Sequence, residues 1–242
     1  MTGYTMLVRT QARLLLREPK VAIFGLGLPL VLLTIFGNIP AFSDGHADLG
    51  GKTTLDAFLP TLVVLSPVIL AVSALPISLA ELREHGVLRR MAVSPVPASG
   101  VLAAQVTVLM STAVCAAAVV AALGTQGFGA KAPAHPVTMI AAYVLGCAAI
   151  VGLGLMVAAI APTAGAASGI AIPIMIVNFF FGGLYTPVET LPHVLATIGQ
   201  YVPFGAMVYT WSGHGQTWQH LAVLAGYAVI GGVVAARTFK WE

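Results

Sequence analysis

The segment LPTLVVLSPVILAVSALPISLA (59–80) decides the fold class, because none of its side chains is charged. A helix of about 20 apolar residues crosses the hydrocarbon core of a bilayer, so the segment predicts a membrane span. The whole chain has the same character, with 58% hydrophobic residues, 8% charged residues and a mean hydropathy of +0.95. A soluble domain would carry roughly 25% charged residues. We therefore expect an all-α integral membrane protein.

Further charge-free stretches of similar length predict a single transmembrane domain, residues 1–242, with six spans. Two of these spans share one charge-free stretch, 132–188, which we divide at APTAG (161–165). The predicted spans are 21–41, 59–80, 101–124, 137–160, 166–185 and 218–236.

The distribution of basic residues predicts how the spans are oriented. Lys and Arg in short loops resist transfer across the membrane, so they accumulate on the cytoplasmic side. With six spans, the two termini share a side with the loop that begins at residue 81. That side carries Arg9, Arg13, Arg17, Lys20, Arg83, Arg89, Arg90, Arg237 and Lys240. The other side carries Lys52 and Lys131, so we predict that both termini are cytoplasmic.

Residues 1–20 have an amphipathic pattern ahead of the first predicted span. Arg9, Arg13 and Arg17 are four residues apart and would share one face of a helix. Apolar side chains would cover the opposite face, as in a helix that lies in the membrane interface with its arginines toward the headgroups. Pro19 would end this helix. The alternative is a disordered basic tail.

The segment 186–217 is predicted to lie outside the cell, between the last two spans. It carries one charged residue, Glu189, and is too apolar for a solvated loop. Pro187, Pro192 and Pro203 would interrupt its helices. We predict an external re-entrant segment of two short helices, which a membrane tolerates where protein covers the non-helical joints.

Several kinds of site are not supported by the sequence. HADLGGKT (46–53) is similar to a phosphate-binding loop, but His46 stands where that loop needs its first glycine. We therefore expect no nucleotide site, no catalytic residue and no cofactor in this chain. The histidines lack the spacing of a metal site, and no run of Lys and Arg indicates nucleic-acid binding. Cys115 and Cys147 lie in apolar stretches and should act as small hydrophobic residues.

The segment ELREHGVLRRMAVSPV (81–96) directly follows the second predicted span. Five of its first ten residues are charged, in a chain where 8% are, and both signs occur. Val87, Leu88 and Met91 stand between the charges. Charges that set the register, beside apolar residues that become buried, are typical of a docking surface. The alternative is an ordinary cytoplasmic loop.

Two stretches resemble the ABC-2 type transporter permeases. The first is EHGVLRR (84–90) followed by SPV (94–96), which is similar to the E-x-G-x-L…(T/S)-P element of that family. The second is GGLYTPVETLPHVLATIGQYVPF (182–204), which is similar to its external, proline-containing re-entrant element. In size the chain resembles the daunorubicin-resistance type of bacterial drug exporter. Gln105 departs from the pattern, since such permeases often carry a lysine soon after the proline turn.

The resemblance implies the membrane subunit of an exporter in the plasma (inner) membrane of a bacterium. Two permease chains, identical or paralogous, would assemble with two ATPase subunits. The ATPase would hold ATP and Mg, so this chain would not itself be an enzyme. Residues 81–92 would form a coupling helix seated in a cleft of the ATPase. Its coupling residues would be Glu81, Arg83, Glu84, Gly86, Leu88, Arg89 and Arg90.

The same resemblance places the substrate between the permease halves, near 59–80 and 166–185. We expect amphipathic drug-like or lipid-like compounds, as in multidrug efflux. The candidate path residues are Ser66, Ser73, Met175, Asn178 and Phe179. Asn178 could instead bond a neighbouring helix. The alternative functions are export of a lipid-linked glycan, a passive channel, or a scaffold for membrane assembly.

Overall fold

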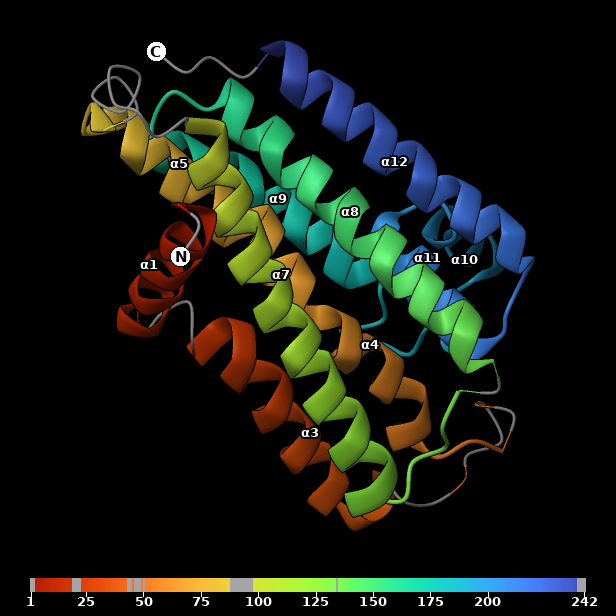
Figure 1. Cartoon of the computed structure of the whole chain (residues 1–242). Helices are drawn as coiled ribbons and strands as arrows, with labels where there is room; N and C mark the ends of the chain where they lie inside the picture. The colour runs from red at the N-terminus through yellow and green to blue at the C-terminus, as the bar shows by residue number, and fades with distance from the viewer. Residues whose placement is uncertain are drawn as a thin grey trace.

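The computed structural model describes residues 3–18, 23–42, 45, 49, 51–87, 98–133 and 135–238. Within these residues the chain is helical, and its only β pairing is an isolated antiparallel bridge between Gly45 and Thr53. The helices form a bundle whose long members run side by side across the molecule (Figure 1). The predicted all-α fold class is therefore confirmed for the described part of the chain.

Among the described residues, five helical segments are long and apolar enough to cross a membrane. They are Thr54–Glu84, Gly100–Gly127, Pro136–Ile160, Ala164–Phe181 and Thr217–Ala235. A shorter apolar segment, Ile23–Asn38, occupies the first predicted span. The structure thus supports five or more spans, and the count of six stays a prediction.

Some of these segments include a wider, π-helical portion. Thr54–Glu84 consists of α4 (Thr54–Val68), the π-helical η4 (Ile69–Ala74) and α5 (Leu75–Glu84). The other apolar segments consist of η1 (Ile23–Gly27), α3 (Leu28–Asn38), α7 (Ala98–Ala122), η5 (Leu123–Gly127), α8 (Pro136–Ile160), α9 (Ala164–Phe181) and α12 (Thr217–Thr238).

The α4–η4–α5 segment is the centre of the bundle, because it contacts α3, α7, α8, α9 and α11. Thr53 and Asp56 begin it with a capping box, in which each side chain bonds the backbone N–H of the other residue. Pro76 has no N–H to donate to the preceding turn. The π-helical η4 lies directly before it, and there the Leu75 N–H bonds the Leu70 carbonyl five residues back.

Glycines allow α8 to approach its neighbours closely. A Cβ atom on Gly154 would lie 1.8 Å from the carbonyl oxygen of Ala71 in η4, so the two backbones touch. Gly152 meets Gly231 of α12 in the same way, since a Cβ on Gly231 would lie 2.6 Å from the Gly152 Cα. Small residues at such crossings are typical of packed membrane helices.

The N-terminal helix α1 (Gly3–Arg17) packs against α7, where the Tyr4 hydroxyl lies 2.8 Å from Thr107 Oγ1. Arg9 and Arg13 are exposed, and so is Leu14. The helix therefore presents both basic and apolar side chains outside the bundle. Its position in the membrane interface stays a prediction.

The segment predicted to lie outside the cell contains η6 (Val188–Thr190), α10 (His193–Gly199) and α11 (Pro203–Ser212). Pro192 and Pro203 stand at the starts of α10 and α11, where a missing N–H costs nothing. Most of α11 is buried, and it packs against α4, α8, α9 and α12. Protein therefore covers α11, whereas α10 is largely exposed, and the depth of the segment in the membrane stays a prediction.

The two ends of the bundle are different in structure. The α1 end contains α1, the C-terminal part of α5, the turn between α8 and α9, and the C-terminal part of α12 (Figure 1). The α10 end contains α10, α11 and the start of α12 (Figure 1). Both ends of the central Thr54–Glu84 helix carry charged residues, and these define the candidate sites.

Candidate functional site

At the α1 end, the helix α5 stops within the segment that was predicted to be a coupling helix. The N–H groups of His85 and Gly86 bond the carbonyls of Glu81 and Arg83 at 3.0 and 2.9 Å. Gly86 has φ +64°, the left-handed conformation that commonly ends a helix and that glycine adopts without strain. Gly86 is therefore a helix stop.

The described part of the predicted coupling helix 81–92 is thus the last turn of α5 and the turn after it. Leu88, Arg89 and Arg90 lie outside the described residues. The coupling role of the segment stays a prediction, but the structure shows what its first charged residues contact.

Arg83 binds the C-terminal end of α8. Its guanidinium Nη1 donates hydrogen bonds to the carbonyl oxygens of Ala158 and Ala161, at 3.2 and 2.9 Å. These are among the last carbonyls of the helix, which have no partner within it. A positive charge is also favourable there, because the helix dipole is negative at its C-terminus.

Glu84 binds the N-terminal end of α9. Its Oε1 accepts a hydrogen bond from the backbone N–H of Ala164 at 3.2 Å. The side chain of Thr163 accepts from the N–H of Ala166 at 3.1 Å and caps the same turn. A negative charge at this position complements the positive end of the dipole of α9.

Two adjacent residues of opposite charge therefore hold the two helix ends that meet at the α8–α9 turn. We call Arg83 and Glu84 the α8–α9 clamp. Because each side chain bonds main-chain groups, the clamp links the end of α5 to the ends of α8 and α9. What the arrangement can do is transmit displacement among the three helices.

A cavity of about 460 Å³ lies beside the clamp, between η1, α3, η4, α5 and α9; we call it the main cavity. Three of the predicted path residues, Ser73, Met175 and Phe179, line it. Glu81, from the predicted coupling set, also lines it. Most of the other lining side chains are apolar, including Phe24, Leu28 and Ile77.

The other two predicted path residues bond neighbouring helices. Ser66 donates to the carbonyl of Gly25 at 2.6 Å and so joins α4 to η1. Asn178 donates to the Ile174 carbonyl at 2.9 Å and accepts from the N–H of Phe204 at 3.4 Å, which joins α9 to the first turn of α11. Asn178 also lines a second cavity, of about 330 Å³, with Pro203 and Tyr227.

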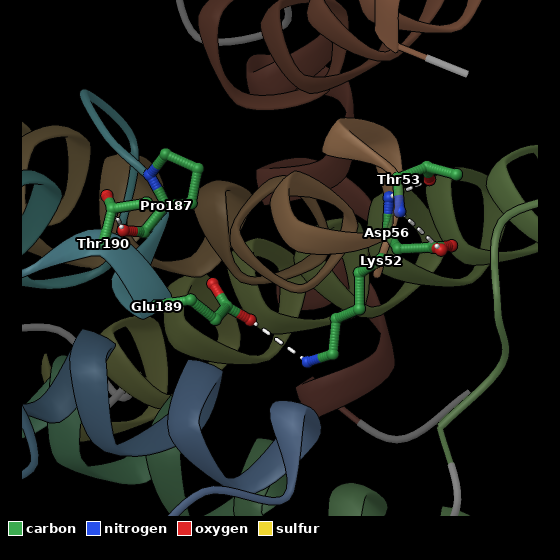
Figure 2. Close-up of polar contacts among 6 residues, drawn as sticks. All are labelled: Lys52, Thr53, Asp56, Pro187, Glu189 and Thr190. Atoms are coloured by element: carbon green, nitrogen blue, oxygen red, sulfur yellow. Dashed lines mark hydrogen bonds and ion pairs between the residues drawn. The ribbon is translucent and has the colours of Figure 1, made fainter. Parts of the chain in front are cut away.

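At the α10 end, the charged groups pair differently (Figure 2). Lys52 Nζ points at Glu189 Oε1, at 3.2 Å, and joins the start of α4 to η6 (Figure 2). The Glu189 side chain is 7% exposed and that of Lys52 is 32% exposed, so the carboxylate is the more buried partner. Asp56, besides its cap, accepts from the Lys131 N–H at 2.7 Å.

Burial raises the pKa of Tyr209 in α11, and the nearby carboxylate of Glu189 raises it further. The phenol therefore stays neutral at physiological pH. Among the described residues, no group of three or more His, Cys, Asp or Glu side chains could hold a metal ion.

Sequence reasoning selected Arg83 and Glu84 for a contact with another protein and missed their contact with α8 and α9. The available signal was that they directly follow a predicted span, on the same predicted side of the membrane as the break at APTAG (161–165). A negative side chain is favourable at the N-terminal end of a helix, and a positive side chain is favourable at the C-terminal end. Two adjacent residues of opposite charge can therefore bind one helix end of each kind.

Comparison with known proteins gives one family match. Residues 2–211 match the family described as ABC-2 type transporter. No curated protein matches the chain. The match includes α1, the clamp, the main cavity and α10, so it extends over both ends of the bundle.

Proposed function

Because the chain belongs to the ABC-2 type transporter family, we propose that it is the permease subunit of an ATP-driven exporter of amphipathic compounds. The family and the apolar helices make it a multi-pass membrane protein. Such a domain is the transmembrane component, without the nucleotide-binding domain, and normally works with an ATPase subunit. Energy must then enter this chain through a contact with that subunit.

The proposal places the α1 end in the cytoplasm of a bacterial cell, at the plasma membrane. The excess of basic residues on the side of the termini supports this orientation. The ATPase would contact the segment that begins at Glu81 and includes Leu88, Arg89 and Arg90. Two ATPase copies and a second permease chain, identical or paralogous, would complete the complex.

The observation that carries the proposal is the α8–α9 clamp. Arg83 and Glu84 lie in the stretch that resembles the coupling element, and their side chains hold the ends of α8 and α9. A push on the segment after Glu84 would therefore reach three long helices together. This is what a permease needs if ATP-driven movement of a partner is to reorient its spans.

The main cavity supports an amphipathic cargo, drug-like or lipid-like, as in multidrug efflux. Its volume of about 460 Å³ falls in the range of small-molecule sites, which are mostly apolar with a few polar groups. Ser73 and Glu81 supply polar groups, and Met175 and Phe179 supply apolar surface.

The test is transport in inside-out vesicles that contain the full chain and the ATPase that co-purifies with it. We expect a fluorescent amphipathic dye to accumulate in the vesicles with ATP and not with a non-hydrolysable analogue. Vesicles with Arg83→Ala should keep the ATPase subunit but transport poorly, whereas the control Arg13→Ala, an exposed arginine of α1, should transport normally.

Three results would overturn the proposal. Flux that needs no nucleotide would indicate a passive channel. The absence of any co-purifying ATPase would favour an assembly scaffold. ATP-dependent movement of a lipid-linked glycan, with no movement of small amphipathic dyes, would identify a glycan exporter.

A further inference from the structure

A smaller cavity, of about 140 Å³, lies at the α1 end between α1, α5 and α7. It shares Glu18, Ala74, Ser78 and Glu81 with the main cavity, so the two adjoin along these residues. We call this shared region the junction. Beside the junction, the wall of the smaller cavity includes a polar group whose hydrogen bonding is incomplete.

That group is the side-chain amide of Gln105 in α7, which lines the smaller cavity and is 9% exposed. Its Nε2 donates to Ser78 Oγ, and Ser78 in turn donates to the Leu75 carbonyl at 3.0 Å. The hydroxyl proton of Ser78 is therefore already used. Gln105 Oε1 is buried and has no hydrogen-bond partner among the described residues. A buried acceptor without a donor is costly, so this oxygen needs an N–H or O–H group.

The junction also carries two negative charges on exposed side chains. Glu18 and Glu81 line both cavities, and neither carboxylate forms a hydrogen bond or an ion pair with another described residue. Arg13 and Arg17 are exposed on α1 and line neither cavity. The two negative charges of the junction therefore adjoin an unsatisfied acceptor of the smaller cavity, a combination that suits a cation with N–H donors.

The main cavity indicates what is attached to such a cation. On the far side of the junction its wall is formed by apolar side chains, among them Phe24, Leu28, Ile69, Met175 and Phe179. A hydrated metal ion would gain nothing from that surface, whereas a hydrocarbon tail would be buried there. The two cavities together fit a molecule with a cationic head and an apolar body.

We propose that the junction binds the protonated primary amino group of a cationic amphiphile, whose apolar part occupies the main cavity. The ligand can be an aminophospholipid of the surrounding membrane or a free amphiphilic amine. That this ligand is also the transported cargo rests on the proposed function. Binding itself needs no ATPase and is tested without one.

The experiment measures equilibrium binding of radiolabelled dodecylamine to the full chain in phosphatidylcholine nanodiscs, with empty nanodiscs as background. We expect saturable binding. Dodecyltrimethylammonium carries the charge without an N–H donor, so it should compete about tenfold more weakly, since one charge-assisted hydrogen bond has about that effect on affinity. Dodecanol, which is neutral, should not compete.

Substitutions at Gln105 provide opposite tests. Gln105→Lys places an ammonium group of the chain itself at the junction and should weaken dodecylamine binding at least tenfold. Gln105→Glu adds a third negative acceptor and should strengthen binding, which keeps the test decisive if the lysine variant folds poorly. Gln216→Lys, the same change at an exposed position of the α10 end, is the matched control and should bind normally.

A second arm separates the two sources of the amine. Phosphatidylethanolamine added to the nanodiscs should weaken dodecylamine binding if the lipid headgroup occupies the junction, and should leave it unchanged if only free amines do. Both outcomes support the site. Binding no greater than in empty nanodiscs, or equal binding by Gln105→Lys and Gln216→Lys, would overturn it. Intact binding without ATP-driven transport would instead reject the proposed function alone.

Discussion

The two ends of the central Thr54–Glu84 helix hold their neighbours by different means. At the α1 end, Arg83 and Glu84 bond main-chain groups of α8 and α9. At the α10 end, Lys52 just before the helix reaches Glu189 through a contact between two side chains (Figure 2). A main-chain group cannot move without its helix, whereas two flexible side chains can separate while both backbones stay in place.

The difference indicates which end transmits force and which end can open. On the proposed function, the clamp would make α5, α8 and α9 move together at the cytoplasmic side. The Lys52–Glu189 pair joins two side chains at the proposed outer side, and its more exposed member, Lys52, can move away while both backbones stay in place. An exporter needs this combination, with a stiff input and a separable exit.

The largest effect is expected for Arg83→Ala, which removes two charge-assisted hydrogen bonds to the end of α8. The loss should cost about 2 kcal/mol of stability and uncouple ATP hydrolysis from transport. The measurement is the ratio of transported dye to ATP hydrolysed in vesicles, together with the midpoint of thermal unfolding in detergent. Arg83→Lys keeps the charge and should restore part of the ratio. An unchanged ratio in Arg83→Ala would show that the clamp transmits nothing.

A somewhat smaller effect is expected for Gly86→Ala, because an alanine at φ +64° is strained by about 1 to 2 kcal/mol. No atom lies within 4 Å of the position that the added Cβ would take, so any effect comes from the backbone. Gly127→Ala is the matched control. The added Cβ would also have no atom within 4 Å there, but Gly127 does not have a positive φ. Thermal unfolding of the two variants checks the prediction, which fails if they are equally stable.

Glu84→Ala should cost about 1 kcal/mol, as expected for the loss of a capping carboxylate at a helix N-terminus. Glu84→Gln keeps an acceptor oxygen and should lose less. Hydrogen exchange of the peptide 161–169 reports on this turn directly. We expect exchange to be slowest in the wild type, faster in Glu84→Gln and fastest in Glu84→Ala. Equal exchange in all three would remove Glu84 from the clamp.

The smallest effect is expected at the α10 end, where a double-mutant cycle of Lys52→Met and Glu189→Gln should give a coupling energy below about 1 kcal/mol. Transport should stay within about twofold of wild type, and the coupling should weaken in high salt. A coupling as large as the effect of Arg83→Ala would show that both ends are stiff, and the comparison would be wrong.

The positions of the long helices were predictable because charge-free stretches and membrane thickness have the same length scale. Their ends were less predictable. The span 59–80 belongs to a helix that runs from Thr54 to Glu84, since Asp56 can lie inside the helix as part of its cap. Conversely, the span 21–41 contains the shorter apolar segment Ile23–Asn38.

The candidate sites were predictable only in part, because one sequence does not show which face of a helix meets which neighbour. Ser73, Met175 and Phe179 do line one cavity. Ser66 and Asn178 are equally polar or more so, yet they bond neighbouring helices. The partners of Arg83 and Glu84 lie 75 to 80 residues away, beyond the reach of local pattern reasoning.

The contact between Gly154 and Ala71 gives the clamp a mechanical advantage. Backbone meets backbone there, so no side chain can yield, and α8 can tilt about this point more easily than it can slide. Gly154 is seven residues from Ala161 and 18 from Pro136, and at 1.5 Å per residue the outer arm of this lever is roughly 2.6 times the inner one. A small rocking of the α8–α9 turn about this point would therefore become a wider swing at the opposite end of the helix.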